Sequence, residues 1–498
     1  MTQKAQRLTL IAMVMASGIV FLDSTVVNVA LPAIDRDLKM GLSGLQWIVD
    51  GYILTLAAFL IVGGSLGDSY GRKKAMLAGL IIFGASSIGC GLAPDARMLV
   101  VARLLQGVGG AFLVPGSLAI ITAVFTGPEE RGKAIGTWAG WSGITSLIGP
   151  FLGGWLVDSF SWHMVFLINV PVIAVVFWLL RSVPESYDRQ SPRKLDLAGA
   201  TLGIAGLGGT VYGLIEGPVL GWDNWLVLVS LVGGLAACGL FILVELKVDH
   251  PMMPLTLFRS GNFRAVNLVT LGVYFALYGV GFFFPLYVQH IMGQSALVSG
   301  VVMLPSSILM LLLSPRIGKL AGRYGARPFM TVGPMIYAAG LLLFLFLQPD
   351  SNIWLIVLPA AFIMGLGLST TVAPLTGIVM ASVPAQNAGV ASAINNVVSR
   401  IAALLAIAGL GILVSQLFAN NLDAVARDLP AEKANLLHMV AKASKGSGNS
   451  QGLPPDLAIL NGEAYTTAFH WVIFICAGLA FLGGLISLLL IRTSPGKA

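Results

Sequence analysis

Long apolar runs dominate the chain and constrain its fold more than any other feature. A helix needs about 20 apolar residues to cross the hydrocarbon core of a bilayer, and we count fourteen such runs in the 498 residues. Only 10% of the residues are charged, against roughly 25% in soluble domains. We therefore expect an all-α polytopic membrane protein. The expected spans are 8–30, 46–66, 75–93, 98–122, 133–154, 164–183, 197–216, 225–245, 265–290, 298–320, 329–347, 354–376, 389–417 and 465–490.

Basic residues gather in the loops on one side of the expected membrane. The positive-inside rule places such loops in the cytoplasm, and both termini fall on the same side. The main clusters are Arg72, Lys73 and Lys74, then Arg189, Arg193 and Lys194, and then Arg316, Lys319 and Arg323. The net charge of +7 therefore reflects membrane sidedness and does not indicate nucleic-acid binding. The first apolar run is too long for a cleaved signal peptide.

Several other classes of site are not expected. Cys90, Cys238 and Cys476 each lie in an apolar run without a partner nearby in sequence, so neither a disulfide nor a metal site is predicted. No phosphate-binding loop of the Gly-x4-Gly-Lys-Ser/Thr form occurs, which argues against ATP as the energy source.

An internal repeat divides the chain. A charged hairpin from Gly64 to Lys74 returns 254 positions later, from Gly318 to Arg327, with Gly322 at the position of Asp68. A Gly-x-Gly pair in span 4 also has a counterpart in span 12. Spans 1–6 thus match spans 9–14, and parallel six-helix halves around a central cavity are typical of one large class of secondary transporter.

The repeat predicts three segments. We expect an N-terminal six-helix bundle over 1–183, a linker with the inserted spans 7 and 8 over 184–264, and a C-terminal six-helix bundle over 265–498. The outer loop 418–464 belongs to the last segment. Its Gly- and Ser-rich stretch 446–452 favours disorder, and 422–442 is expected to form a short amphipathic helix.

Several stretches resemble one transporter family. Leu22 to Pro32 resembles the first-helix motif of the 14-span drug:proton antiporters (QacA/EmrB type) of the major facilitator superfamily. The hairpin at 64–74 resembles that superfamily's loop between spans 2 and 3. The stretch 103–110 is similar to its span-4 motif, 143–154 to its span-5 antiporter motif, and 162–171 and 388–400 to further stretches of QacA-type exporters. The resemblance covers essentially the whole chain. It implies the major facilitator fold and proton-driven export of hydrophobic, often cationic compounds across the cytoplasmic (inner) membrane of a bacterium.

Charged residues inside the spans are candidates for proton coupling. An ionised Asp23 within span 1 would cost several kcal/mol and is a functional hypothesis by default, with a structural hydrogen bond as the alternative. Arg103 in span 4 needs a carboxylate partner, for which Asp23 and Asp50 are available. Gln106 lies one turn deeper and can share the network. Arg103 can also act as a static brace, and Asp50 can be an interfacial residue in contact with water.

Two motifs are candidates for gating. In the hairpin, Asp68 with Gly67, Gly71, Arg72 and Lys73 is expected to form an inner gate latch, because a carboxylate there can contact the positive N-terminal end of a helix in the opposite half. The alternative is a solvated charged turn. In span 5, small residues permit close helix approach and a proline kinks the helix, so a tight contact with the facing half is expected to limit proton leak. Ordinary packing is the alternative. The span-5 residues are Gly143, Gly149, Pro150, Gly153 and Gly154.

Polar and aromatic side chains within the spans are candidates for the wall of the substrate cavity. They are Gln106, Asn28, Trp47, Tyr52, Tyr274, Tyr278, Asn395 and Asn396. For the tyrosines, packing or lipid contact is the alternative. Spans 9–14 contain no Asp or Glu, so we expect a dication to be a poor substrate and a monovalent cation, neutral amphiphile or weak acid to be a better one.

The sequence therefore predicts a proton-coupled multidrug or toxic-compound exporter that works by alternating access. The alternatives are a proton symporter that imports a small nutrient, an exporter of a single endogenous natural product or lipid, and a non-transporting sensor or assembly factor. We expect no enzymatic activity, no cofactor beyond the proton motive force, no metal and no nucleic acid. The expected partners are a hydrophobic small molecule, the proton and the lipid bilayer. A monomer is expected, joined by a periplasmic adaptor if the source bacterium has two membranes.

Overall fold

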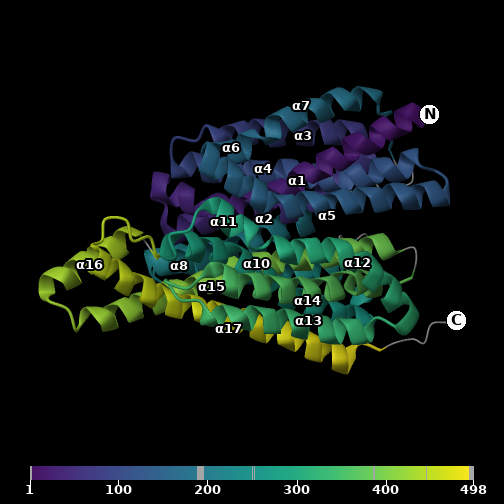
Figure 1. Ribbon diagram of the computed structural model, residues 1–498. Helices are drawn as coiled ribbons and strands as arrows, with labels where there is room; N and C mark the ends of the chain where they lie inside the picture. The colour runs from purple at the N-terminus through teal and green to yellow at the C-terminus, as the bar shows by residue number, and fades with distance from the viewer. Residues whose placement is uncertain are drawn as a thin grey trace. The chain divides into compact units, whose positions relative to one another are not determined.

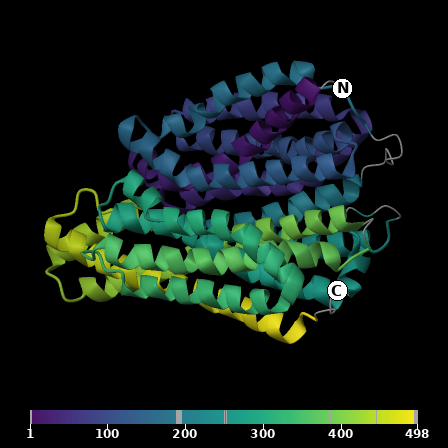
Figure 2. The same cartoon turned by 45° about the vertical axis from the view of Figure 1, so that its right-hand side comes forward.

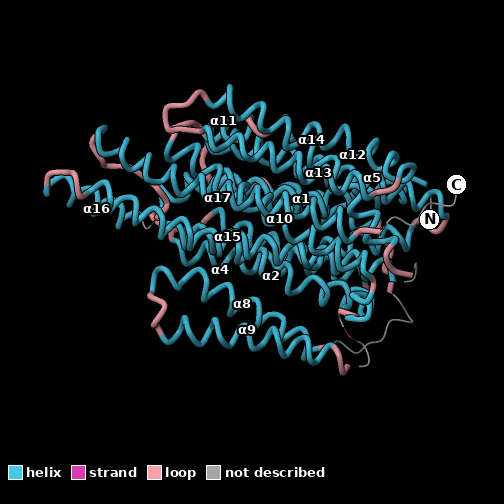
Figure 3. Tube along the Cα trace, turned by 90° about the horizontal axis from the view of Figure 1, so that it is seen from below, coloured by secondary structure: helices cyan, strands magenta, loops and turns pink. Residues whose placement is uncertain are grey.

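The computed structural model describes residues 3–187, 196–248, 251, 253–384, 387–444 and 446–492, and every regular element within these ranges is helical (Figure 3). Arg189, Arg193 and Lys194 of the expected cytoplasmic clusters lie outside the described residues.

The helices follow one another through short connections. In chain order they are α1 (Gln3–Leu38), α2 (Gly41–Tyr70), α3 (Arg72–Gly91), α4 (Ala96–Val124), α5 (Pro128–Ser159), α6 (His163–Leu167), α7 (Asn169–Leu179), η1 (Leu180–Ser182), α8 (Leu197–Leu220), α9 (Trp225–Glu245), η2 (Leu255–Arg259), α10 (Gly261–Leu286), η3 (Tyr287–Ile291), α11 (Ala296–Val301), α12 (Leu304–Tyr324), α13 (Arg327–Leu342), η4 (Leu343–Phe346), α14 (Ile353–Ala381), α15 (Ala388–Ala426), α16 (Ala431–Ser444) and α17 (Pro455–Leu490).

Each of the fourteen expected spans falls on a helix or on a short series of helices. By length and composition, 13 of the described helical segments can cross a membrane, which identifies a multi-pass membrane protein. The segment missing from that set is α5, which carries the expected span 133–154. It is long enough, but its many Gly, Ser and Thr residues make it less apolar than its neighbours. The count of fourteen is therefore not confirmed.

The chain forms two compact units. Unit 1 comprises residues 1–34, 47–210 and 229–252, and unit 2 comprises 35–46, 211–228 and 253–498. In unit 1, α3 packs along α4 and against α6 and α7, and Figure 1 shows α3 and α7 side by side. In unit 2, α14 lies between α12 and α13, while α10 packs against α15 and α17. In Figure 2 these helices, which are coloured from green to yellow, run alongside one another.

Matched glycines set the same packing in both units. A Cβ on Gly109 of α4 would lie 2.6 Å from the backbone of Phe83 on α3, so the two helix backbones are in contact. Gly367 of α14 faces Tyr337 of α13 just as closely. Because small residues permit such close approach, the repeated Gly-x-Gly pair accounts for the corresponding helix pairs in the two halves.

The hairpin repeat also has a conformational basis. Gly71 between α2 and α3 has a φ of 123°, and Gly325 between α12 and α13 has a φ of 85°. Residues with a Cβ rarely adopt such angles. The glycine at this turn is therefore required in both copies.

The segment 418–464, the expected outer loop, is more ordered than the sequence predicts. The helix α15 continues to Ala426, and α16 packs against both α15 and α17 at one end of unit 2 (Figure 1). In the Gly/Ser stretch, Ser447 is buried and its carbonyl lies 3.1 Å from Nδ1 of His290. The side chain of Asn461 donates to the carbonyl of Gly448 at 3.0 Å. These contacts correct the expectation of disorder for the described residues 446–452, because buried hydrogen bonds hold a stretch whose composition alone favours flexibility.

Candidate functional site

The principal candidate site of unit 1 is a buried ion pair between α1 and α4. Nη1 of Arg103 donates to Oδ2 of Asp23 at 2.5 Å. The exposed fraction is 0% for Asp23 and 1% for Arg103. The carboxyl group of Asp95 caps α4 by accepting from the amide of Met98 at 2.9 Å, so α4 begins two turns before Arg103. Of the two acids that the sequence offered to Arg103, the structure selects Asp23.

Amide side chains complete the coordination of the carboxylate. Oδ1 of Asp23 accepts from Nε2 of Gln106 at 3.0 Å and from Nδ2 of Asn169 at 3.1 Å. The same two amides donate to Oγ of Ser87 at 3.2 and 3.0 Å, and Ser87 donates to the carbonyl of Phe166 at 2.8 Å. Gln106 is fully buried, so it belongs to this network and does not line an open cavity.

Sequence reasoning missed Asn169 and Ser87. Each is a small polar residue inside an apolar run, Asn169 at the start of α7 and Ser87 in α3. Asn169 lies in the stretch 162–171 that resembles the family, which was the available signal. Ser87 has no comparable signal, because serines are common in membrane helices and usually bond to their own backbone.

Aromatic rings and a carbonyl hold the rest of the guanidinium. Nε of Arg103 donates to the carbonyl of Ile48 at 2.9 Å. The guanidinium carbon lies 4.1 Å from the ring centroid of Tyr52 and 5.7 Å from that of Phe166, within the range of a cation–π interaction. Tyr52 is only 1% exposed. It therefore stabilises Arg103 here, and its expected place in the wall of the substrate cavity stays a prediction.

Asp50 has a different environment. Its side chain is 0% exposed, and neither carboxyl oxygen has a hydrogen-bond partner among the described residues. The structure thus excludes the interfacial, water-contacting alternative for this residue. Burial of an unpaired charge is costly, so Asp50 is a second candidate for a group that changes its charge during the working cycle.

The hairpin binds a carboxylate that the sequence analysis overlooked. Glu185 accepts from the amides of Lys73 at 2.9 Å and Lys74 at 3.3 Å, at the positive N-terminal end of α3. A Cβ on Gly71 would lie 2.8 Å from that carboxyl group, a second reason for a glycine there. Asp68, the carboxylate expected to form the latch with the opposite half, pairs with Arg72 at 2.7 Å.

The remaining latch contacts are local. Arg72 also donates to the carbonyl of Ala119 on α4 at 3.2 Å, and the carbonyl of Gly67 accepts from the amide of Gly71 at 3.0 Å. Within unit 1, the hairpin is therefore fastened to α4 and to the segment after η1. The latch toward the opposite half stays a prediction.

The span-5 glycines pack against α1 of their own unit. A Cβ on Gly149 would collide with Thr25, and one on Gly153 would lie 2.8 Å from the carbonyl of Val26. Gly143 has no heavy atom within 4 Å of such a Cβ, and Gly154 is buried beside Gly153. Gly149 and Gly153 therefore bring α5 close to α1, and the expected contact with the facing half stays a prediction. Pro150 lies inside the continuous helix α5.

Two expected cavity residues of unit 1 are partly exposed. They are Asn28 on α1 and Trp47 on α2. Oδ1 of Asn28 is buried and has no hydrogen-bond partner among the described residues.

In unit 2 the expected residues lie along the seam between α10 and α15. Nδ2 of Asn395 donates to Oδ1 of Asn267 at 3.0 Å and to Thr270 at 2.7 Å. The rings of Tyr274 and Tyr278 have centroids 6.3 Å apart. Asn396 is exposed and donates only to the carbonyl of Ser392, at 3.0 Å. The structure therefore brings these four expected residues into one region.

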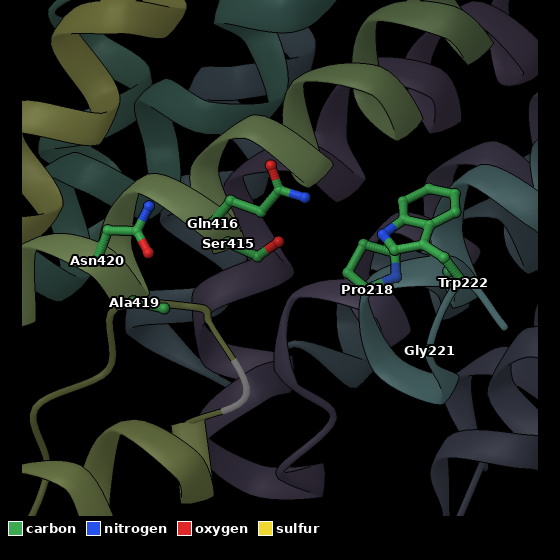
Figure 4. A pocket seen from close by; sticks show the side chains of 8 residues that line it. Pro218, Gly221, Trp222, Ser415, Gln416, Ala419 and Asn420 are labelled. Atoms are coloured by element: carbon green, nitrogen blue, oxygen red, sulfur yellow. The ribbon is translucent and has the colours of Figure 1, made fainter. Parts of the chain in front are cut away.

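Unit 2 also contains a pocket that the sequence analysis did not predict. It has a volume of about 440 Å³. Figure 4 shows Trp222 and Pro218 facing the amide-bearing side chains of α15 across it. The lining residues are Gly217, Pro218, Gly221, Trp222, Ser415, Gln416, Ala419 and Asn420. None of them is charged, so the pocket can offer stacking and neutral hydrogen bonds but no ion pair.

Comparisons with known proteins agree with this architecture. The chain is 37% identical over 408 residues to the multidrug resistance protein Stp of Mycobacterium tuberculosis (strain CDC 1551 / Oshkosh), which covers 82% of this chain and 76% of that protein. It is 34% identical to the tetracenomycin C resistance and export protein of Streptomyces glaucescens, with 82% and 76% covered.

A solved structure shows the same fold. It is the crystal structure of a bacterial homologue of the human lysosomal transporter Spinster, in an inward-facing, unoccupied conformation. It superposes with a TM-score of 0.66 over 99% of this chain and 100% of that one, at 17% identity. A family model matches residues 13–407. The chain therefore belongs to the Major Facilitator Superfamily, and this family and fold point to a transporter rather than an enzyme.

Proposed function

We propose that this protein is a proton-coupled exporter of hydrophobic toxic compounds, an antiporter of the 14-span type in the cytoplasmic membrane of a bacterium with both termini inside. Two relatives that are at least 34% identical over most of the chain are named for multidrug resistance and for tetracenomycin C resistance and export. These names support drug efflux as the function. The proton as driving ion, the antiport direction and the sidedness are our inference from the residues.

The observation that carries the proposal is the sealed pair of Asp23 and Arg103. Their charges cancel at a separation of 2.5 Å, away from solvent. A proton on Asp23 would leave the guanidinium without its counter-ion, and breaking a buried pair in this way costs about 3–5 kcal/mol. That energy is large enough to favour another arrangement of α1 and α4, in which the network is open to water. Proton binding can therefore be coupled to alternating access.

The hydrogen-bond network also favours the charged form of Asp23 over its protonated form. Gln106 and Asn169 can donate to a carboxylate but offer the protonated form fewer partners, since both amides already point their N–H groups at Oδ1 of Asp23. Loading of a proton therefore weakens three hydrogen bonds at once.

Efflux by reconstituted protein tests the proposal. The full chain is placed in proteoliposomes with an imposed pH gradient, and transport of tetracenomycin C and of a panel of hydrophobic monocations, neutral amphiphiles and weak acids is followed with and without an uncoupler. We expect transport that collapses with the uncoupler and is lost in Asp23→Asn. The matched control is Glu463→Gln, which neutralises an exposed carboxyl group on α17 and should leave transport unchanged. Native-like, gradient-dependent transport by Asp23→Asn would refute the proton role of Asp23, and gradient-independent transport by the native protein would refute antiport.

A further inference from the structure

Arg400 is an intramembrane cation in unit 2. It lies 12 residues into α15 (Ala388–Ala426) and is partly exposed. Its Nη1 donates to the hydroxyl of Tyr278 at 3.3 Å, and none of the ion pairs among the described residues includes it. An arginine inside a membrane helix is costly and marks a functional site by default. The described contacts supply one weak neutral acceptor for a full positive charge.

No carboxylate of the surrounding helices lies near Arg400. The helices α10, α12, α13 and α14 contain no Asp or Glu. The next acid on α15 is Asp423, 23 residues further along, which is about 35 Å at the rise of an α-helix. Asp456 and Glu463 of α17 lie in its first turns, beside α16 at the far end of α15. Unit 1 gives its buried arginine a carboxylate at 2.5 Å, whereas none of the ion pairs among the described residues of unit 2 includes Arg400.

The neighbours of Arg400 can hold the rest of an amphiphilic ligand. Asn396 lies one helical turn earlier, on the same face of α15, and it is exposed. The hydroxyl of Tyr278 accepts from the guanidinium, and the rings of Tyr278 and Tyr274 have centroids 6.3 Å apart. Asn395, by contrast, is engaged by Asn267 and Thr270 and serves to fix α15 against α10.

We infer that Arg400, Asn396 and Tyr278 form a subsite for the anionic group of the substrate, and that the substrate is a singly negative amphiphile with a flat apolar body. A guanidinium binds a carboxylate through two parallel hydrogen bonds, Asn396 adds an amide, and the two tyrosine rings contact the apolar body. The inference rests on the proposed export function. It narrows the substrate from the three classes that the sequence left open to the weak acids.

A triad of probes with one ring system and different charges tests the subsite. The probes are 9-anthracenecarboxylate, 9-anthracenecarboxamide and 9-anthrylmethyl-trimethylammonium, and their binding to the purified full chain in detergent is measured by fluorescence. The native protein should bind the anion at least about tenfold more tightly than the amide, since a hydrogen bond to a charged group is worth that much or more, and it should bind the cation most weakly. In Arg400→Gln the anion should lose about tenfold in affinity, while the amide stays within about twofold.

Two further variants act as controls. Arg323→Gln removes the same charge from an exposed position on α12, so it should retain the native order of affinities. Arg400→Lys keeps the charge but not the paired donors, so it should bind the anion with intermediate affinity. If Arg400→Gln does not give a monodisperse protein, the order of the three probe affinities in the native protein and the anion affinity of Arg400→Lys still test the subsite.

The inference is overturned if the native protein shows no preference for the anion. It is also overturned if Arg400→Gln or Arg400→Lys binds the anion as tightly as the native protein does. The same holds if Arg323→Gln lowers the affinity for the anion as much as Arg400→Gln does. Export of the probes from energised proteoliposomes separates this inference from the proposed function. Arg400-dependent anion binding without energised export supports the subsite and refutes the export function. Energised export of the probes without a preference for the anion supports the export function and refutes the subsite.

Discussion

Replacing Asp23 by asparagine removes the carboxylate that balances Arg103 while it preserves the shape of the side chain. Because the two residues are 0% and 1% exposed, water cannot screen the guanidinium that remains. Loss of one partner of such a buried pair costs about 3–5 kcal/mol of folding free energy. Two amide donors, from Gln106 and Asn169, also lose a charged acceptor. We therefore expect Asp23→Asn to be destabilised by at least about 3 kcal/mol.

The double variant Asp23→Asn/Arg103→Gln decides whether the pair itself is responsible. Removing both charges leaves no uncompensated ion, and such replacements are often neutral. The double variant should therefore be more stable than either single variant, with a coupling energy of about 2 kcal/mol or more between the sites. Transport should be lost in all three, since the group that binds the proton or its counter-ion is missing.

The free energy of unfolding can be measured by titration with SDS in mixed micelles, followed by thiol labelling. Cys90 is buried, with its Sγ 3.6 Å from Oε1 of Gln106, so its labelling reports the site directly. Cys476 is buried in unit 2 and reports the other half, in a background with Cys238→Ala. Strictly additive effects of the two substitutions, or a native-like stability of Asp23→Asn, would show that Asp23 and Arg103 do not stabilise the protein as a pair.

Other predictions concern the contacts that surround the network. Asn169→Leu removes a hydrogen bond to a charged acceptor and should cost about 1.5–3 kcal/mol, measured by the same SDS titration; an unchanged midpoint would contradict its role. Gly149→Ala places a methyl group against α1 and should cost about 1–3 kcal/mol, whereas Gly143→Ala enters open space and should be within about 0.5 kcal/mol of native in thermal unfolding. Gly71→Ala, at a φ of 123°, should cost about 1–3 kcal/mol. Glu185→Gln should cost only about 0.3–1 kcal/mol and should speed hydrogen exchange at the start of α3; equal exchange in the two proteins would argue against the cap.

Many elements of the fold could be predicted from the sequence because they depend on local properties. The length of an apolar run decides whether it can cross a bilayer, whatever its neighbours are. The glycine at the hairpin turn depends on the backbone angle at Gly71 and Gly325, which is a property of the turn itself. The internal repeat could also be recognised in the sequence, because it too consists of local features. The boundaries, such as the extension of α15 to Ala426, the order of residues 446–452 and the modest hydropathy of α5 departed from expectation.

Partners across helices could not be predicted in the same way. The sequence offered Arg103 two acids, and only the rotation of α1, α2 and α4 about their axes decides that Asp23 receives it while Asp50 is left without a partner. That rotation depends on close contacts such as the one between Gly149 and Thr25. The periodicity of apolar residues in the sequence does not reveal such contacts. Asn169 reaches the same carboxylate from 146 residues away. The sequence by itself therefore determined that this chain spans a membrane in two related halves with charges inside. The tertiary structure alone decided which charges meet, because a side chain's partner depends on how whole helices pack.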